Sequence, residues 1–167
     1  MLSPKLCQMK TKRKKNDTKL TFKVAVEKTK DITNCYQSGL KALGAHSSKV
    51  ELANNFLCDG SVDIDLNVAL KYPNANRWDY AFSYKSEVFF VEVHSAHTGE
   101  VKTVLKKLQW LKDWLVQHAP HLNSLKAKSN GPYFWIQSSG FHIPKTSPQF
   151  RQASQAGVRP ISKLILN

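Results

Sequence analysis

Two neighbouring stretches of the sequence decide the fold: RWDYAFSY at residues 77–84 and VFFVEVHS at residues 88–95. Both are rich in the aromatic and β-branched residues that favour strands. The short connection between them predicts an antiparallel hairpin. The second stretch is apolar at nearly every position up to Val91, which is typical of a central strand buried on both faces.

Polar side chains interrupt this apolar hairpin at a few positions. Because successive side chains of a strand point to opposite faces, Asp79 shares a face with the small residues Ala81 and Ser83, and Glu92 shares one with His94. The opposite face of the first strand is expected to carry its aromatic residues, Trp78, Tyr80, Phe82 and Tyr84. If the strands are neighbours, Asp79 can lie close to Glu92.

Two facing carboxylates repel each other unless one is protonated or a cation lies between them. A divalent cation such as Mg²⁺ or Mn²⁺ is the natural solution, since these ions prefer oxygen ligands. The backbone carbonyl of Val93 would lie at the same level and can supply a third oxygen. A purely structural alternative stays open for each group. Asp79 can cap a turn or pair with Arg77 or Lys85, and Glu92 and His94 can pair with each other or with Gln137.

The rest of the chain alternates helical and extended patterns. The apolar spacing predicts helices over residues 32–43, capped by Asp31 and stopped by Gly44, and over residues 99–118 and 148–156. It predicts strands over residues 61–70 and over residues 132–138, the latter ended by Gly140. Residues 20–26, 49–57 and 161–166 stay ambiguous between strand and helix. Strands with helices on both sides predict a layered α/β domain.

This order of elements and the polar positions together resemble the PD-(D/E)xK nuclease superfamily over roughly residues 31–140. That family has a helix, a three-strand meander, a helix and a strand. Its motif is an Asp near the start of one strand, followed by (Asp/Glu)-x-Lys on the next. Here Trp78-Asp79 stands for Pro-Asp, and Glu92-Val93-His94 stands for Glu-x-Lys.

The resemblance implies a restriction-endonuclease-like core, with a central mixed sheet flanked by helices in α-β-β-β-α-β order. It also implies a Mg²⁺-dependent (or Mn²⁺-dependent) hydrolase of phosphodiester bonds, with DNA the expected substrate. Asp79, Glu92 and the Val93 carbonyl would hold the metal, and Asp79, Glu92 and His94 would carry catalysis. His94 replaces the motif lysine, so an inactive nucleic-acid-binding module on the same scaffold is the alternative.

Several other residues are candidates for supporting roles. Lys102 and Lys106 can replace the positive charge of the missing lysine, and Glu51 and Gln137 occupy regions where some family members carry an extra acid or a Gln. Asp63 and Asp65 alternate on an expected strand and are interpreted as a solvent-facing edge rather than as metal ligands. A third hypothesis is a basic interaction or structural protein whose carboxylates only satisfy one another.

Charge is the strongest signal about partners. The 167 residues carry a net charge of +13, which favours a polyanion such as nucleic acid. We expect a basic, flexible arm at residues 1–19 and one nuclease-like domain at residues 20–167. The expected nucleic-acid contacts are Lys12, Arg13, Lys14, Lys15, Lys145, Arg151 and Arg159.

The sequence also argues against several classes of protein. Its three cysteines form no C-x-x-C pair, which disfavours a zinc knuckle and fits a reducing cytoplasm. No apolar run approaches the roughly 20 residues of a membrane helix. The basic N-terminus lacks the apolar stretch of a signal peptide. We therefore expect a cytoplasmic protein without a membrane partner, and a homodimer stays open.

Overall fold

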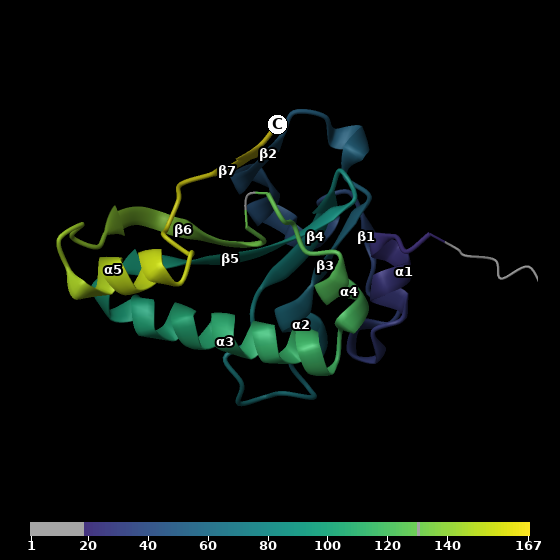
Figure 1. Ribbon diagram of the computed structural model, residues 1–167, viewed down its shortest axis with the longest axis horizontal. Coiled ribbons are helices and arrows are strands. Elements are labelled where there is room, and N and C mark those ends of the chain that lie inside the picture. Colours follow the sequence, from purple (N-terminus) through teal and green to yellow (C-terminus); the bar gives the residue numbers. More distant parts are fainter. Residues whose placement is uncertain (1–18, 130) are drawn as a thin grey trace, which may run out of the picture.

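The structure, a computed structural model, describes residues 19–129 and 131–167. Its centre is a five-stranded sheet with the spatial order β1-β3-β4-β5-β6 (Figure 1). These strands are β1 (Gln37–Ser38), β3 (Gly60–Asp63), β4 (Tyr80–Tyr84), β5 (Glu87–His97) and β6 (Tyr133–His142). Neighbours are antiparallel from β1 to β5, whereas β6 runs parallel to β5. The predicted α/β class with a mixed central sheet is confirmed.

Helices cover one face of this sheet and a smaller layer covers the other. The helices are α1 (Phe22–Glu27), α2 (Ile64–Val68), α3 (Val101–Gln117), α4 (Pro120–Ser124) and α5 (Pro148–Gln155). All five contribute buried residues to one apolar cluster. The second cluster lies between the sheet, the 3₁₀ segment η2 (Lys41–Lys49) and a two-stranded parallel sheet of β2 (Val50–Leu52) and β7 (Leu164–Leu166). The remaining 3₁₀ turns are η1 (Lys30–Ile32), η3 (Asn55–Leu57) and η4 (Thr98–Glu100).

The predicted hairpin is β4–β5, and its turn sets the pairing. Tyr84 pairs with Glu87, and the two turn residues Lys85 and Ser86 have φ angles of 50° and 66°. Positive φ at both central positions is the conformation that matches the twist of the flanking strands. The register continues to Tyr80 opposite Val91. As expected, β5 is buried on both faces, because Phe89 and Phe90 belong to different apolar clusters.

Helix α3 confirms the most regular apolar spacing of the sequence. Val104, Leu108, Leu111 and Leu115 are buried along one stripe, and Trp114 joins them. Helix α5 is likewise close to its predicted range, with Ser147 accepting a hydrogen bond from the Phe150 N–H at its N-cap. Helix α4 was not predicted and begins at Pro120, a residue suited to the first helical turn.

The helix predicted over residues 32–43 is wrong. Asn34 and Gly39 have positive φ angles of 66° and 58°, so the chain turns twice in this stretch and forms only η1, β1 and the start of η2. Asp31 does not cap a helix. Its carboxylate instead accepts hydrogen bonds from Tyr72 (2.7 Å) and from Trp114 Nε1 (3.0 Å). The apolar spacing reflected burial of Ile32 against the core rather than helical geometry.

Three further boundaries differ from prediction. The strand expected over residues 61–70 stops at Asp63, whose side chain accepts a hydrogen bond from the Leu66 N–H (2.8 Å) and so starts α2. Gly140 does not end β6, which continues to His142 after a register shift against β5. Trp78 precedes β4 and lies in the cluster under α3, whereas Phe82 and Tyr84 lie in the other cluster.

Two further predictions concerned the absence of a membrane-spanning helix and the presence of a basic N-terminal arm. None of the helices in the described ranges is long and apolar enough to cross a lipid bilayer. The predicted basic arm, with Lys12, Arg13, Lys14 and Lys15, lies outside the described residues.

Candidate functional site

The two predicted carboxylates meet at the point where β4 begins. Asp79 immediately precedes β4, and the hairpin register brings it opposite Glu92 on β5. The Asp79 N–H donates to Glu92 Oε2 (3.1 Å), and the Val93 N–H donates to Asp79 Oδ2 (2.9 Å). Each carboxylate is thus held by a backbone amide of the other strand, which fixes both side chains.

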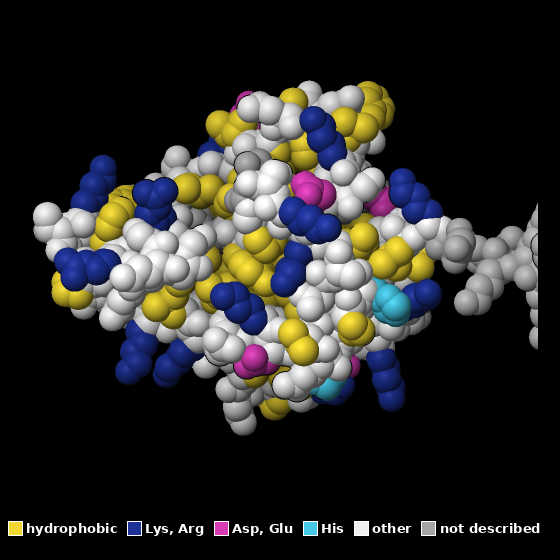
Figure 2. Space-filling model, in the orientation of Figure 1, with side chains coloured by type: hydrophobic (Ala, Val, Ile, Leu, Met, Phe, Trp, Pro, Cys, Tyr) yellow, Lys and Arg dark blue, Asp and Glu magenta, His cyan; other side chains and the backbone are white. Residues whose placement is uncertain are grey.

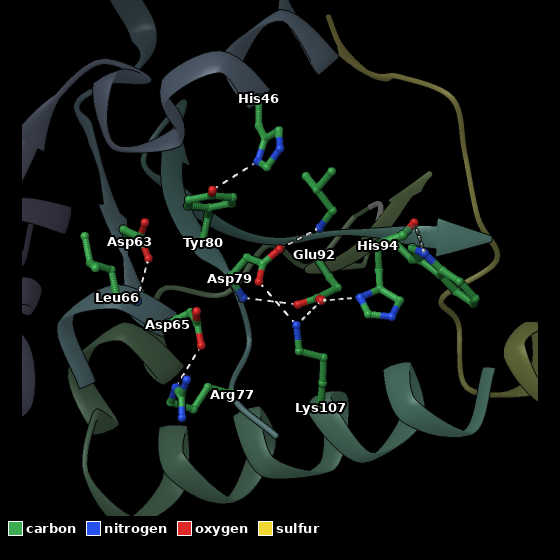
Figure 3. Close-up of polar contacts among 12 residues, drawn as sticks. His46, Asp63, Asp65, Leu66, Arg77, Asp79, Tyr80, Glu92, His94 and Lys107 are labelled. Carbon is green, nitrogen blue, oxygen red and sulfur yellow. Dashed lines mark hydrogen bonds and ion pairs between the residues drawn. The ribbon is translucent and has the colours of Figure 1, made fainter. Parts of the chain in front are cut away.

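A lysine from the helix layer lies between these carboxylates. Lys107 on α3 places its Nζ atom 3.2 Å from Asp79 Oδ1 and also in contact with Glu92 Oε1 (Figure 3). Glu92 is completely buried, and the side chains of Asp79 and Lys107 are only 18% and 15% exposed. Because so little water reaches the group, each charge depends on its partners for stabilisation.

The cation between the two carboxylates is the ammonium group of Lys107, which the sequence analysis did not predict. The facing carboxylates do require a cation, and in the metal-free protein an ammonium group supplies it. Neither Arg77 nor Lys85 fills that role, since Arg77 pairs with Asp65 (2.8 Å) and Lys85 donates to the Asn167 carbonyl (2.9 Å). Across residues 19–129 and 131–167, no cluster of three or more His, Cys, Asp or Glu side chains is arranged to hold a metal ion.

Burial and charge shift the pKa values of this centre. Burial, together with the neighbouring charge of Glu92, raises the pKa of Asp79 to about 6, although Lys107 and the Val93 amide oppose the shift. Burial alone would lower the pKa of Lys107, but the two carboxylates outweigh it, so this pKa is raised. Lys107 therefore stays charged at neutral pH, whereas Asp79 titrates only slightly below neutral pH.

His94 forms the rim of the same centre. Its Nδ1 atom lies 3.5 Å from Glu92 Oε1, and its Nε2 atom lies 2.7 Å from Glu100 Oε2. The pKa of His94 is raised by Glu92 and also by Glu100. The contact with Glu92 is the longer one, but that carboxylate is completely buried and less screened by water than Glu100. The position of the ring between two carboxylates stabilises its protonated form.

The sequence left open that Glu92 and His94 pair with each other or with Gln137, and that Asp79 caps a turn. The Glu92–His94 contact is present, while Gln137 contributes its backbone carbonyl to Lys49 (3.0 Å) rather than its side chain to Glu92. The carboxylate of Asp79 accepts hydrogen bonds from the Val93 N–H on the neighbouring strand and from Lys107, and these contacts are not those of a turn cap.

The supporting candidates lie elsewhere. Lys102 and Lys106 line an open cavity of about 680 Å³ between α3 and α5, and neither Asp79 nor Glu92 borders it. Glu51 is exposed on β2 and pairs with Lys163 (2.7 Å). Asp63 caps α2 and Asp65 pairs with Arg77, so neither joins the carboxylate centre.

The predicted nucleic-acid contacts of the C-terminal part gather around α5. Arg151 is exposed on that helix, and Lys145 and Arg159 flank it in the chain. Figure 2 shows Lys and Arg side chains around this end of the molecule, with hydrophobic side chains between them.

Lys107 is the functional residue that sequence reasoning missed. It lies three residues after Val104 and four before Leu111, so it belongs to the buried stripe of α3 rather than to its solvent face. A lysine on the apolar stripe of an amphipathic helix was the available signal, because a buried ammonium group needs a carboxylate partner.

Comparisons with protein families, with curated proteins and with solved structures found no match to this chain.

Proposed function

We propose that the protein is a Mg²⁺-dependent (or Mn²⁺-dependent) nuclease that hydrolyses phosphodiester bonds in nucleic acid, with DNA the favoured substrate. The observation that carries this proposal is the convergence of one Asp79 oxygen and one Glu92 oxygen on a single cation, the ammonium of Lys107. Two carboxylates on adjacent strands that share one cation are the donor set on which a two-carboxylate nuclease depends.

The resemblance to PD-(D/E)xK nucleases supports the same reading. The strands β3, β4 and β5, the helix α3 and the parallel strand β6 keep the family's order, although α2 lies between β3 and β4, α4 lies between α3 and β6, and the opening helix expected over residues 32–43 is not formed. The main departure was His94 in place of the motif lysine. Lys107 places a lysine ammonium at the same two carboxylates, but it belongs to α3, whereas the motif lysine would belong to β5.

The residues present fit a hard divalent cation. Asp79 and Glu92 offer charged oxygens, and the Val93 carbonyl is the third donor. The Val93 N–H points toward Asp79, and in a strand the carbonyl of a residue points to the same side as its N–H. A bound Mg²⁺ would supply Lewis acidity, activating a water molecule and offsetting negative charge on the phosphate.

The side chains around this donor set have distinct roles in the proposal. Lys107 offsets the charge of the two carboxylates in the metal-free protein. With a divalent cation held by Asp79 and Glu92, its ammonium would be available to donate to the phosphate or to the attacking water. His94, oriented by Glu100, donates to the phosphate when protonated and accepts a proton from water when neutral. The net charge of +13 attracts the polyanionic substrate to the molecule.

The test is cleavage of plasmid and single-stranded DNA in the presence of Mg²⁺ or Mn²⁺. We expect Asp79→Asn and Glu92→Gln to lower the rate by at least about a hundredfold and Lys107→Gln to lower it by about tenfold to a thousandfold. Asp113→Asn removes an exposed carboxylate of α3 and is the matched control. The proposal fails if the purified wild-type protein cuts nothing, or if both carboxylate variants cut as well as the control.

One observation favours a second candidate, a nucleic-acid-binding module without catalysis. The ammonium of Lys107 contacts both carboxylates and His94 also contacts Glu92, so the two carboxylates have cationic partners without a metal when His94 is protonated. This candidate predicts salt-sensitive binding that is equal in EDTA and in Mg²⁺ and unchanged in Glu92→Gln. Gel-shift titrations under both conditions separate it from the nuclease.

A further inference from the structure

A second recess lies beyond the carboxylate centre, at the far end of β6. Its volume is about 430 Å³, within the range of small-molecule sites. Its walls include two aromatic rings, two basic side chains and one amide: Phe141, Phe150, Lys145, Arg159 and Gln137. We call it the β6 cavity.

The fold builds the β6 cavity from three separate segments. Phe141 belongs to β6, and Phe150 belongs to α5, which packs along α3 (Figure 1). The segment that follows α5 is fixed beside β6, because the Ile161 N–H donates to the Trp135 carbonyl (2.9 Å) and the Gln137 N–H donates to the Ile161 carbonyl (2.8 Å). Arg159 therefore projects from an anchored part of the chain.

The aromatic rings provide a surface for stacking. Phe141 and Phe150 meet edge to face, with ring centroids 6.3 Å apart and an angle of 83° between their planes. Phe141 remains 36% exposed, and it is one of the few large hydrophobic side chains in the described residues with that much surface in water. A flat apolar partner would cover this ring without disturbing the pair.

The charge around the cavity has one sign. No Asp or Glu follows Asp113 in the sequence, so the last 54 residues carry no acidic side chain. Neither Lys145 nor Arg159 forms an ion pair within the described part of the chain. Two free cations beside a stacking surface are the combination that binds the backbone and bases of single-stranded nucleic acid.

The β6 cavity is also connected to the carboxylate centre. Gln137 on its wall is the register partner of His94 on the adjacent parallel strand. Partners on neighbouring strands are about 4.8 Å apart and point to the same face of the sheet. The wall of the β6 cavity that Gln137 forms is therefore one strand away from His94 at the rim of the carboxylate centre.

We propose that the β6 cavity holds one unstacked nucleotide of a single-stranded polynucleotide, with its base on Phe141 and its phosphate between Lys145 and Arg159. The identification of this bound polynucleotide as the substrate of the nuclease rests on the proposed function. Its binding in the β6 cavity requires no metal. The chemistry favours a single strand over a duplex, because the faces of duplex bases are already covered by their neighbours.

The experiment measures binding by fluorescence anisotropy in EDTA, where no metal-dependent cleavage occurs. The probes are labelled single-stranded DNA and RNA oligonucleotides and a duplex of the same sequence. We expect Phe141→Leu, which keeps an apolar side chain but removes the ring, to weaken single-strand binding by roughly tenfold. We expect Lys145→Gln/Arg159→Gln to weaken it further and to make the slope of log affinity against log salt shallower by about 0.7, which is the contribution of the one phosphate that the two cations share.

Matched variants separate this site from general charge. Lys28→Gln/Lys41→Gln removes two exposed lysines, one just after α1 and one at the start of η2, neither of which lines the β6 cavity, and this variant is expected to bind nearly as well as wild type. The proposal is overturned if this control weakens binding as much as Lys145→Gln/Arg159→Gln, if Phe141→Leu binds like wild type, or if the duplex is bound more tightly than the single strands.

Failure of the nuclease proposal gives a different result. In that case Mg²⁺ produces no cleavage, yet Phe141→Leu still weakens single-strand binding in EDTA, and the β6 cavity stands as a binding site. If instead cleavage depends on Asp79 and Glu92 while Phe141→Leu binds and cuts like wild type, the nuclease stands and the β6 cavity proposal falls.

Discussion

Lys107 is the residue on which the charge balance of the carboxylate centre depends. Without its ammonium group, the completely buried Glu92 and the mostly buried Asp79 would repel each other with only His94 nearby. An uncompensated buried charge is among the costliest defects a core can contain.

Replacing Lys107 tests that balance directly. We expect Lys107→Gln to lower the free energy of unfolding by about 3–5 kcal/mol in EDTA at pH 7, because Glu92 stays buried without its cation. The double variant Glu92→Gln/Lys107→Gln should lose clearly less than the sum of the two single variants, since two amides carry no charge. Urea unfolding measures all four proteins, and additive losses would contradict the pairing.

The raised pKa of Asp79 gives a second prediction at this scale. Its value of about 6, against an ordinary 3.8, means that the folded protein binds more protons than the unfolded chain between these pH values. The free energy of unfolding of the metal-free protein therefore falls as the pH rises through that window. Asp79→Asn escapes this loss, so its stability relative to wild type should improve by up to about 3 kcal/mol from pH 4 to pH 7.

Denaturant unfolding in EDTA at a series of pH values checks this prediction. Asp113→Asn, which removes an exposed carboxylate from the other end of α3, should follow the wild-type pH profile in parallel. Parallel profiles for Asp79→Asn as well would mean that the carboxyl of Asp79 titrates normally.

At the scale of elements, the β4–β5 turn determines whether the site forms. The register that starts from Tyr84 opposite Glu87 is the one that brings Asp79 to Glu92, and a slip of one residue would turn Glu92 to the other face. Lys85 and Ser86 both adopt positive φ, which side chains with a Cβ atom tolerate poorly.

Glycine at the second turn position should therefore stabilise the protein. We expect Ser86→Gly to raise the free energy of unfolding by about 0.5–1 kcal/mol, because glycine adopts positive φ without steric cost. Ser138→Gly, in the exposed part of β6, is the opposite control and should lower it. Thermal unfolding of both variants decides the matter, and a destabilised Ser86→Gly would count against the turn as described.

Helix α3 is the second element on which the carboxylate centre depends. Its buried stripe fixes Lys107 over the start of β4, and η4 just before it brings Glu100 to His94. The same helix presents Lys102 and Lys106 on its outer side, toward α5. One helix therefore serves the carboxylate centre on one face and a basic surface on another.

For the molecule as a whole, charge is divided along the chain. The carboxylates of the centre come from the first two thirds, while the last 54 residues carry basic side chains and no acidic ones. Folding brings the two parts together across β5 and β6, where His94 faces Gln137. The two proposals therefore concern neighbouring parts of the molecule, the carboxylate centre on β5 and the basic, aromatic β6 cavity.

The sequence by itself determined the features that depend on local pattern. The alternation in residues 77–95 predicted the hairpin and the meeting of Asp79 with Glu92, and the apolar spacing predicted α3 and α5. These succeed because side-chain periodicity and short turns are set by residues near one another in the chain.

Only the tertiary structure decided which cation Asp79 and Glu92 share and which of the predicted helices and strands form. The apolar stripe of α3 indicates that Lys107 is buried, but Lys107 is 28 residues from Asp79, and no local pattern shows which carboxylates it will contact. The helix expected over residues 32–43 failed for the same reason. Asp31 bonds to Tyr72 and Trp114, which are 41 and 83 residues away, and these distant contacts outweigh local helical preference.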